Sequence, residues 1–317
     1  MFNKKSILNK KDVLVTGAAG VIGRELINLL KEAGANIRAV DFQEKPAAFG
    51  NIDYFRCDLS HPDSQFLFRF EPNYVFHLAA DFERSAENLL FWDTNFANNI
   101  LASHYTLNQA VKCPALKKII FASSYLIYDK KLYNDTGGGN VLSEKSIINP
   151  RNICGVSKLQ TERDIEFFYE KMNRRFSYAC ARIFRVYGQG SRDIISRWVR
   201  LALRSEELSV FDAKNSFDYI YAKDAALGLI KMAEIEEAKG IINLGTGVSA
   251  SIGEVLELIR HLMPEVKSKN VKKSIFLESS CADVSKLKKK LGWIPQTRLE
   301  DGIKEIIAYE KKKISQR

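Results

Sequence analysis

A glycine-rich segment near the start of the chain, TGAAGVIG at 16–23, lies between a short apolar run and an amphipathic run. The apolar run at 13–15 predicts a buried strand, and the apolar spacing over 21–33 predicts a helix. Glycines at 17, 20 and 23 permit a sharp turn, close approach of the backbone to a pyrophosphate, and close packing of helix on strand. The start of the helix then presents free N–H groups to the phosphates. The segment therefore predicts a dinucleotide-binding loop, with its ligand against Gly17, Gly20, Val21, Ile22 and Gly23.

A carboxylate stands at the end of the second predicted strand, 37–40. Asp41 in this place accepts hydrogen bonds from the hydroxyls of the adenosine ribose and repels a 2′-phosphate, which favours NAD over NADP. Asp58 and Leu59 follow a third short strand, where they are predicted to flank the adenine. A helix cap ahead of 61–62 explains Asp58 equally well.

Short apolar runs alternate with helical stretches through the first half of the chain. Strands are predicted at 74–76, 119–122 and 178–183, and helices at about 86–111 and 159–172. Strands separated by helices are typical of an α/β fold with a doubly wound parallel sheet. The second half is less regular, with helices predicted at 193–204, 252–262 and 299–312, and the glycines at 137–139 predict a loop.

Composition excludes several classes of protein. The 317 residues include no run of about 18 apolar residues, so we expect no membrane span, and the polar, basic segment 1–11 predicts no secretory signal. Five scattered cysteines without a C-x-x-C pair, and four scattered histidines, predict reduced thiols, a cytoplasmic location and no metal site. The net charge of +10 is assigned to solvated lysines such as those at 286–290 and 311–313. Because no stacking aromatic residues accompany them, we expect no nucleic-acid partner.

Further motifs follow the glycine loop in a characteristic order. They are His77-Leu78-Ala79-Ala80, Asn95, Ser123-Ser124, Lys158 with Glu162, Arg182 to Gly188, Asp218 to Asp224, Asn243 to Gly247, and Leu291-Gly292-Trp293 with Pro295. With these motifs the chain resembles the extended short-chain dehydrogenases/reductases, and among them the NAD-dependent nucleotide-sugar epimerases and dehydratases. The resemblance implies that NAD is also bound by Leu78, Ala79, Ala80, Asn95 and Lys158.

The resemblance also implies an architecture. A Rossmann domain, 1–183 plus 217–247, is expected to hold NAD, and a smaller discontinuous C-terminal domain, 184–216 plus 248–317, to hold a nucleoside-diphosphate sugar. The chemistry is expected between them, at the carboxyl ends of the parallel strands. Many members of the family pair through two helices from each subunit, which predicts a homodimer formed by the helices at about 95–112 and 155–172.

The catalytic set of this family is a Ser or Thr, a Tyr and a Lys, the last two in the pattern Y-x-x-x-K. Ser124, four residues before Tyr128, matches the residue that hydrogen-bonds the reacting oxygen of the sugar. Lys158 matches the lysine that binds the nicotinamide ribose. The tyrosine moves the proton of a sugar hydroxyl, and at its position this chain has Cys154.

Three explanations of Cys154 stay open. A tyrosine was replaced by design to trap a bound substrate, or the thiol itself ionises beside Lys158 and serves as acid and base, or the chain binds a nucleotide sugar without converting it. A small residue that only fills space explains Cys154 as well. Tyr125, directly after Ser124, is a further candidate to replace the missing phenol.

Other departures narrow the reaction and the substrate contacts. Family 4,6-dehydratases carry an Asp-Glu pair after the catalytic Ser or Thr, whereas this chain has Tyr125 and Leu126, which argues against elimination of water. Arg185 stands where the family often has Asn, and Phe217 where an Arg commonly faces the diphosphate. We predict that Arg185, with Arg192, binds the diphosphate instead.

These residues together predict a nucleotide-sugar 4-epimerase that oxidises and re-reduces one sugar carbon with bound NAD. A nucleotide-sugar dehydratase or reductase is one alternative. A catalytically silent protein that binds NAD and a nucleotide sugar is the other.

Overall fold

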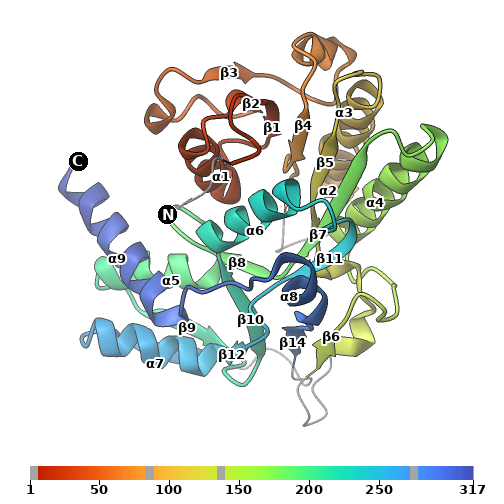
Figure 1. The fold of residues 1–317 in the computed structure, drawn as a ribbon. Coiled ribbons are helices and arrows are strands. Elements are labelled where there is room, and N and C mark those ends of the chain that lie inside the picture. Colours follow the sequence, from red (N-terminus) through yellow and green to blue (C-terminus); the bar gives the residue numbers. More distant parts are fainter. Residues whose placement is uncertain (1–5, 83–88, 134–139, 272–277, 317) are drawn as a thin grey trace.

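The computed structural model describes residues 6–82, 89–133, 140–271 and 278–316. Within these residues, seven strands form an all-parallel sheet in the order β3, β2, β1, β4, β5, β7, β11 (Figure 1). They are β1 (Asp12–Thr16), β2 (Asn36–Asp41), β3 (Asp53–Arg56), β4 (Tyr74–His77), β5 (Lys118–Ser124), β7 (Ser177–Ile183) and β11 (Gly240–Leu244). The order runs outward from β1 to β3 on one side and from β4 to β11 on the other, so the switch point lies between β1 and β4. The predicted doubly wound parallel sheet is confirmed.

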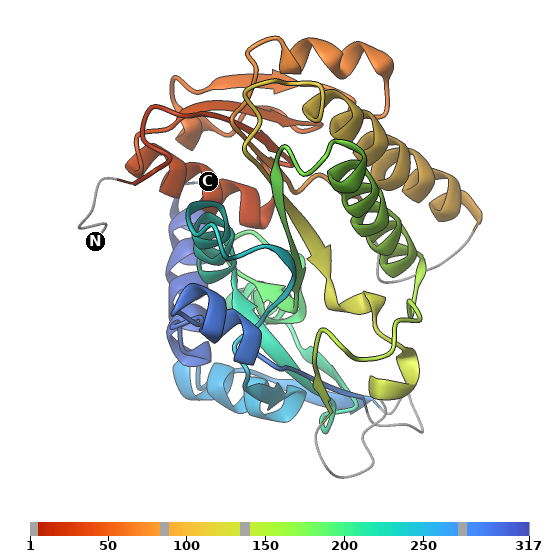
Figure 2. The same cartoon turned by 45° about the vertical axis from the view of Figure 1, so that its right-hand side comes forward.

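Helices cover both faces of this sheet (Figure 2). On one face, α1 (Val21–Glu32) packs beside α6 (Ala222–Glu234), together with α8 (Ser285–Leu291). On the other face lie α3 (Ala102–Ala110) and α4 (Ile153–Lys171). Each face therefore buries a hydrophobic core of its own, as a sheet in a three-layer α/β fold must.

The long helix predicted at about 86–111 is present over its described part, with one irregularity. It consists of α2 (Leu89–Asn95), a π-helical turn η3 (Phe96–Leu101) and α3. A π turn holds more residues than an α turn and therefore rotates the side chains that follow it.

Helix α4 begins earlier than predicted, at Ile153 instead of 159. The side chain of Asn152 caps it by accepting a hydrogen bond from the N–H of Gly155 at 2.9 Å. A Cβ at Gly155 would overlap the carbonyl oxygen of Leu126, so this glycine permits close packing of the helix start.

A smaller lobe lies at the carboxyl-terminal side of the large sheet (Figure 1). Its central strand β10 (Ser216–Tyr221) pairs with β8 (Arg185–Tyr187), β12 (Ser249–Ser251) and β14 (Ser279–Ala282), and β14 pairs with β6 (Val141–Leu142). A separate two-stranded sheet is formed by β9 (Leu208–Phe211) and β13 (Ser268–Val271). Helices α5 (Ile194–Leu203), α7 (Ile252–Leu262) and α9 (Leu299–Ser315) enclose its apolar core. The expected smaller, discontinuous lobe is thus present.

The predicted domain bounds differ from the strand pairing at one place. We expect the Rossmann domain to resume at 217, but β10 belongs to the smaller sheet, and the chain returns to the large sheet with α6 and β11. The division into two domains otherwise stays a prediction. The predicted glycine loop at 137–139 lies outside the described residues. In the described part of the chain, no helix has the length and apolar character to cross a membrane.

Candidate active site

The glycine loop after β1 leaves room for a ligand against backbone atoms. Gly17 has a φ of +68°, and a Cβ there would lie 2.6 Å from the backbone nitrogen of Ala79. A Cβ at Gly23 would overlap the carbonyl oxygen of Gly17. Helix α1 begins directly after Gly20, and no side chain caps its first N–H groups. These free donors in a loop without side chains fit the pyrophosphate of a dinucleotide.

A buried set of hydrogen bonds holds β1 against β4 beneath this loop. The Oγ1 of Thr16 lies 2.7 Å from Nδ1 of His77, and Nε2 of His77 lies 2.8 Å from the Oγ of Ser103. The same Thr16 hydroxyl accepts hydrogen bonds from two backbone N–H groups after β4, each at 3.2 Å. Burial, reinforced by the charge of Lys158, lowers the pKa of His77 to about 3, so its imidazole is neutral.

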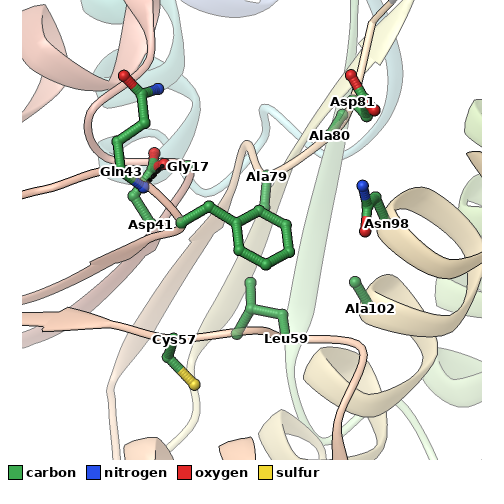
Figure 3. A pocket seen from close by; sticks show the side chains of 11 residues that line it. Gly17, Asp41, Gln43, Cys57, Leu59, Ala79, Ala80, Asp81, Asn98 and Ala102 are labelled. Atoms are coloured by element: carbon green, nitrogen blue, oxygen red, sulfur yellow. Dashed lines mark hydrogen bonds between the residues drawn. The ribbon is translucent and has the colours of Figure 1, made fainter. Parts of the chain in front are cut away.

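A cavity opens beside the loop where β1, β2 and β4 end (Figure 3). Its lining consists of Gly17, Asp41, Phe42, Gln43, Cys57, Leu59, Ala79, Ala80, Asp81, Asn98 and Ala102. The Asp41 carboxylate accepts hydrogen bonds from the N–H groups of Ala19 at 2.9 Å and Gln43 at 3.0 Å, and this fixes its orientation. Apolar walls with a fixed carboxylate at one end fit an adenosine whose ribose lies at Asp41.

Two residues predicted to bind the cofactor lie away from this cavity. Asp58 is exposed, and its carboxylate accepts hydrogen bonds from the N–H of Ser60 at 2.8 Å and its hydroxyl at 2.7 Å. Asn95 is fully buried, and its amide nitrogen lies 3.8 Å from the sulfur of Cys154. Asn98, in the π turn, lines the cavity instead.

A second cavity continues from the loop to the ends of β5 and β7. Its lining consists of Gly17, Gly20, Val21, Ile22, Gly23, Leu78, Ala80, Phe82, Ala122, Ser123, Ser124, Tyr125, Lys158, Ile183, Phe184, Val186 and Ser191. Gly17 and Ala80 line both cavities, so the two form one groove across the carboxyl ends of the strands. The structure therefore brings Ser124 and Lys158 into the groove that the glycine loop begins.

Lys158 enters the groove from the second turn of α4. Its Nζ donates a hydrogen bond to the carbonyl oxygen of Ala122 at 2.7 Å. Burial lowers the pKa of this amine to about 8, against the opposing effect of Cys154 and Glu162. Ser124 ends β5, and its Oγ accepts a hydrogen bond from a backbone N–H at 3.2 Å, which leaves its hydroxyl proton available to a ligand.

A buried ion pair links the elements that carry Ser124 and Lys158. Arg182 of β7 donates two hydrogen bonds to Glu162 of α4, at 3.1 and 2.8 Å, and the hydroxyl of Ser123 donates to the same carboxylate at 2.6 Å. The ring of Tyr128 lies 4.9 Å from the guanidinium, and its hydroxyl donates to Asn243 at 2.6 Å. The hydrogen bonds of this pair are charge-assisted and tie β5 and β7 to α4, while Nη1 of Arg182 has no hydrogen-bond partner among the described residues.

The thiol of Cys154 is buried next to the groove. The residue is 1% exposed and packs in an apolar cluster with Tyr125 and Phe184. Its sulfur contacts Asn95, and it lies 4.0 Å from the carbonyl oxygen of Asp81. Cys154 is not among the described residues that line either cavity, so an acid or base role for this thiol requires a rearrangement.

Arg185 and Arg192, both predicted to bind the diphosphate, have different surroundings. The guanidinium of Arg185 stacks on the ring of Phe217, and its Nε is buried without a hydrogen-bond partner among the described residues. Burial acts to lower the pKa of Arg185, but neighbouring groups, first among them Tyr125, together raise it above its ordinary value. Arg192 is exposed to solvent.

Comparison with known proteins decides which family this groove belongs to. The model of the NAD dependent epimerase/dehydratase family matches residues 13–245. The chain belongs to this family. The resemblance seen in the motifs is thereby confirmed, and NAD, predicted from the loop and Asp41, is the cofactor of the family.

Individual epimerase/dehydratase proteins resemble the chain over nearly its whole length. A protein of Bacillus subtilis named as an uncharacterized UDP-glucose epimerase is 29% identical over 322 residues, covering 94% of this chain and 97% of its own. A UDP-N-acetyl-alpha-D-glucosaminuronate decarboxylase of Bacillus cytotoxicus is 29% identical over 335 residues, covering 95% and 98%. Similar structures include MoeE5 in complex with UDP-glucuronic acid and NAD (28% identity, TM-score 0.84, covering 95% of this chain and 99% of that one). The UDP-glucose 4-epimerase of Thermotoga maritima with UDP-glucose is similar too (26% identity, TM-score 0.83, 96% and 99%).

Several groove residues of this family member are not evident from its motifs. Phe42, Gln43, Cys57 and Asn98 line the first cavity, and Phe82 lines the second. The first two directly follow Asp41, so the position of that carboxylate is a signal that could have indicated them. Asn98 has no such signal, because the π turn that presents it has no sequence pattern of its own.

Proposed function

We propose that this member of the epimerase/dehydratase family is an NAD-dependent nucleotide-sugar 4-epimerase. The observation that carries the proposal is the single groove, in which Ser124 and Lys158 lie next to the glycine loop and no Asp or Glu is among the described residues that line the cavity around them. A 4-epimerase needs a hydroxyl donor, a lysine and bound NAD, whereas water elimination needs a further acid and base. Tyr125 and Leu126 occupy the positions where such a pair stands in the dehydratases.

Different residues of the groove would bind different parts of the cofactor and the substrate. The N–H groups at the start of α1 would hold the pyrophosphate, and Asp41 the adenosine ribose. Lys158 would donate to the nicotinamide ribose, and Ser124 to the reacting oxygen of the sugar. NAD, when bound, supplies the acceptor and donor of an electron pair for one sugar carbon.

The proposed substrate is a nucleoside-diphosphate sugar with uracil as its base. Support comes from the similar structures of MoeE5 and the Thermotoga maritima epimerase, whose titles name UDP-sugars. Arg185 stands between Phe184 and Val186, which both line the groove, and its buried Nε has no hydrogen-bond partner among the described residues, so it retains a donor for an anion. A guanidinium can donate two parallel hydrogen bonds to the oxygens of a diphosphate, and Arg192 supplies a second, exposed cation.

One observation favours a second candidate function. Because Cys154 is buried and is not among the described residues that line either cavity, a protein that binds NAD and nucleotide sugar without turnover has the same described features. The dehydratase and reductase alternatives have no comparable support in the groove.

The test incubates the NAD-loaded full chain with UDP-glucose, UDP-N-acetylglucosamine and UDP-glucuronic acid, and follows the products by NMR. Inversion at C4 of one of these sugars is the expected result. A Lys158→Met variant should lose the activity, and Arg163→Met, an exposed residue of the same helix, should keep it. If neither the natural chain nor a Cys154→Tyr variant forms a product while both retain NAD and bind a UDP-sugar, the silent binder replaces the enzyme.

We also propose a homodimer through α2, η3 and α4. Trp92, Phe96, Val156 and Phe167 are exposed there, at 58%, 53%, 45% and 57%. Leu107 lies within the predicted dimer helix 95–112, but it is fully buried in the core and is not part of this surface. A solution mass near twice 36.0 kDa, reduced to the single chain in a Phe167→Lys variant, is the expected outcome.

A further inference from the structure

Cys154 stands at the position where the resemblance places the catalytic tyrosine, but another tyrosine, Tyr125, is among the residues that line the groove. Cys154 is buried outside the groove, whereas Tyr125 lines the same cavity as Ser124 and Lys158. The question is whether Tyr125 is held firmly enough, and in suitable surroundings, to do the work of the missing residue.

Tyr125 is fixed on several sides. Its ring stacks on Phe184 with centroids 5.0 Å apart and planes inclined by 17°. The hydroxyl of Tyr133 donates to its backbone carbonyl oxygen. The side chain of Ser124 caps the short 3₁₀ turn Tyr125–Ile127. A phenol held by a stacked ring and a capped turn keeps one orientation, which is a condition for efficient proton transfer.

The surroundings of Tyr125 include a cation that the family pattern does not provide. Arg185 stands in place of the usual Asn, and Tyr125 is the first of the groups that raise its pKa, so guanidinium and phenol are neighbours. The stacking of Arg185 on Phe217 holds the guanidinium in this place. A guanidinium beside a phenol stabilises the phenolate that forms when the proton leaves.

We propose that Tyr125 is the residue that moves the proton of the sugar hydroxyl, with Arg185 as its positioning and charge-stabilising partner. This inference rests on the proposed function, and it deepens that function by assigning the acid and base. It also accounts together for the departures at 125, 154, 185 and 217.

The proton transfer balances as follows. In the oxidation, the O–H bond of the sugar hydroxyl breaks, its proton bonds to the phenolate oxygen of Tyr125, and its electron pair forms the second bond of the ketone. The carbon-bound hydrogen leaves with its own electron pair to the oxidised family cofactor. In the return step the same bonds form and break in reverse on the other face of the sugar, and Tyr125 ends as the phenolate.

The experiment compares Tyr125→Phe with Cys154→Ala in the NAD-loaded full chain. Tyr125→Phe removes one oxygen and keeps the stacking on Phe184, so the variant is expected to fold, and thermal unfolding checks this. We expect kcat for the UDP-sugar to fall by about 100-fold or more in Tyr125→Phe with little change in KM. In Cys154→Ala the loss should be less than about tenfold, because only packing changes there.

Two outcomes overturn the assignment. One is a Tyr125→Phe variant whose kcat stays within tenfold of the natural chain. The other is a Cys154→Ala variant that loses more activity than Tyr125→Phe.

A binding measurement separates this inference from the proposed function. If the natural chain converts no sugar, the epimerase proposal fails, and calorimetric titration with UDP-glucose and with UDP then decides on Tyr125. Affinity for UDP-glucose that falls about threefold or more in Tyr125→Phe, with affinity for UDP unchanged, supports a phenol in contact with the sugar. Equal affinities in variant and natural chain for both ligands overturn that contact.

Discussion

The guanidinium carbon of Arg185 lies 3.4 Å from the centre of the Phe217 ring. Arg185 on β8 stands where the resemblance places Asn, and Phe217 on β10 stands where it places Arg. In this chain the cation therefore lies on the neighbouring strand, and the ring of Phe217 supports it. Arg185 of β8 pairs with Tyr219 of the neighbouring parallel strand β10. Phe217 precedes Tyr219 by two residues and therefore lies on the same side of β10. A cation that is stacked but not hydrogen-bonded at Nε retains capacity for an anionic ligand.

Exchange of both residues tests this relationship. Arg185→Asn should weaken the affinity for UDP by about 10- to 100-fold, because a charge-assisted hydrogen bond is lost. Phe217→Arg alone should also weaken it, since two guanidinium groups would then repel each other. The double variant, which restores the family arrangement, should recover affinity to within about tenfold of the natural chain. Titration with UDP measures all three, and equal affinity in Arg185→Asn and the natural chain would contradict the diphosphate role.

Substitution of Gly17 and of Gly50 separates the effect of backbone strain from the effect of steric overlap. Gly17→Ala introduces a Cβ 2.6 Å from the backbone of Ala79 at a φ of +68°. We expect a loss of stability of about 1–3 kcal/mol and loss of bound NAD. Gly50→Ala is the control, because Gly50 has a φ of +60° and no atom within 4 Å of its Cβ position. It should cost about 1–2 kcal/mol and leave NAD binding intact. Urea unfolding and the NAD content of the purified variants measure both effects.

His77 should make the fold sensitive to acid. Its pKa in the folded chain, about 3, lies below the ordinary value near 6.5, so only the unfolded chain takes up this proton as the pH falls below about 6.5. The stability is therefore complete above that pH and falls by up to about 1.4 kcal/mol for each pH unit below it. His77→Gln should be less stable near neutral pH and lose less stability from about pH 7 to about pH 5. Identical pH dependence in both chains, measured by urea unfolding, would show that another group is responsible.

Asp41 should determine the choice between the two nicotinamide dinucleotides. Asp41→Asn keeps an oxygen that can accept from the N–H of Ala19 but removes the negative charge that faces the ribose. The ratio of NAD to NADP affinity is expected to fall by about tenfold. Fluorescence titration of the chain freed of cofactor measures the ratio. Asp58→Asn, which changes an exposed carboxylate bonded to Ser60, should leave the ratio as it is.

The parts of the fold that could be predicted are those with a strong local pattern. The apolar runs of β1, β4, β5 and β7 and the loop at Gly17 specify the large sheet, because buried parallel strands are continuous and apolar. The smaller sheet could not be predicted in this way. Its strands β8, β12 and β14 are three or four residues long and come from distant parts of the chain, so only tertiary pairing defines them.

The candidate site was predictable where chemistry requires one residue type. Ser124, Lys158 and the loop glycines line the groove as predicted. The surroundings of Asn95 and Asp58 were not predictable, because tertiary packing buries Asn95 beside Cys154 and a turn at Ser60 holds the carboxylate of Asp58. Proximity of Tyr125 and Arg185 also depends on packing between the two lobes, which no local pattern encodes.

Two of the connections between the two sheets are short. β7 passes into β8 with only Phe184 between them, and β10 continues into α6 at Ala222 without an intervening residue. Hinge motion needs a few residues free to change their backbone angles, and these crossings are occupied by hydrogen-bonded strands and a helix start. At these two crossings the backbone therefore has little freedom to bend, so we expect ligand exchange to proceed through movements of side chains and loops at the rim of the groove.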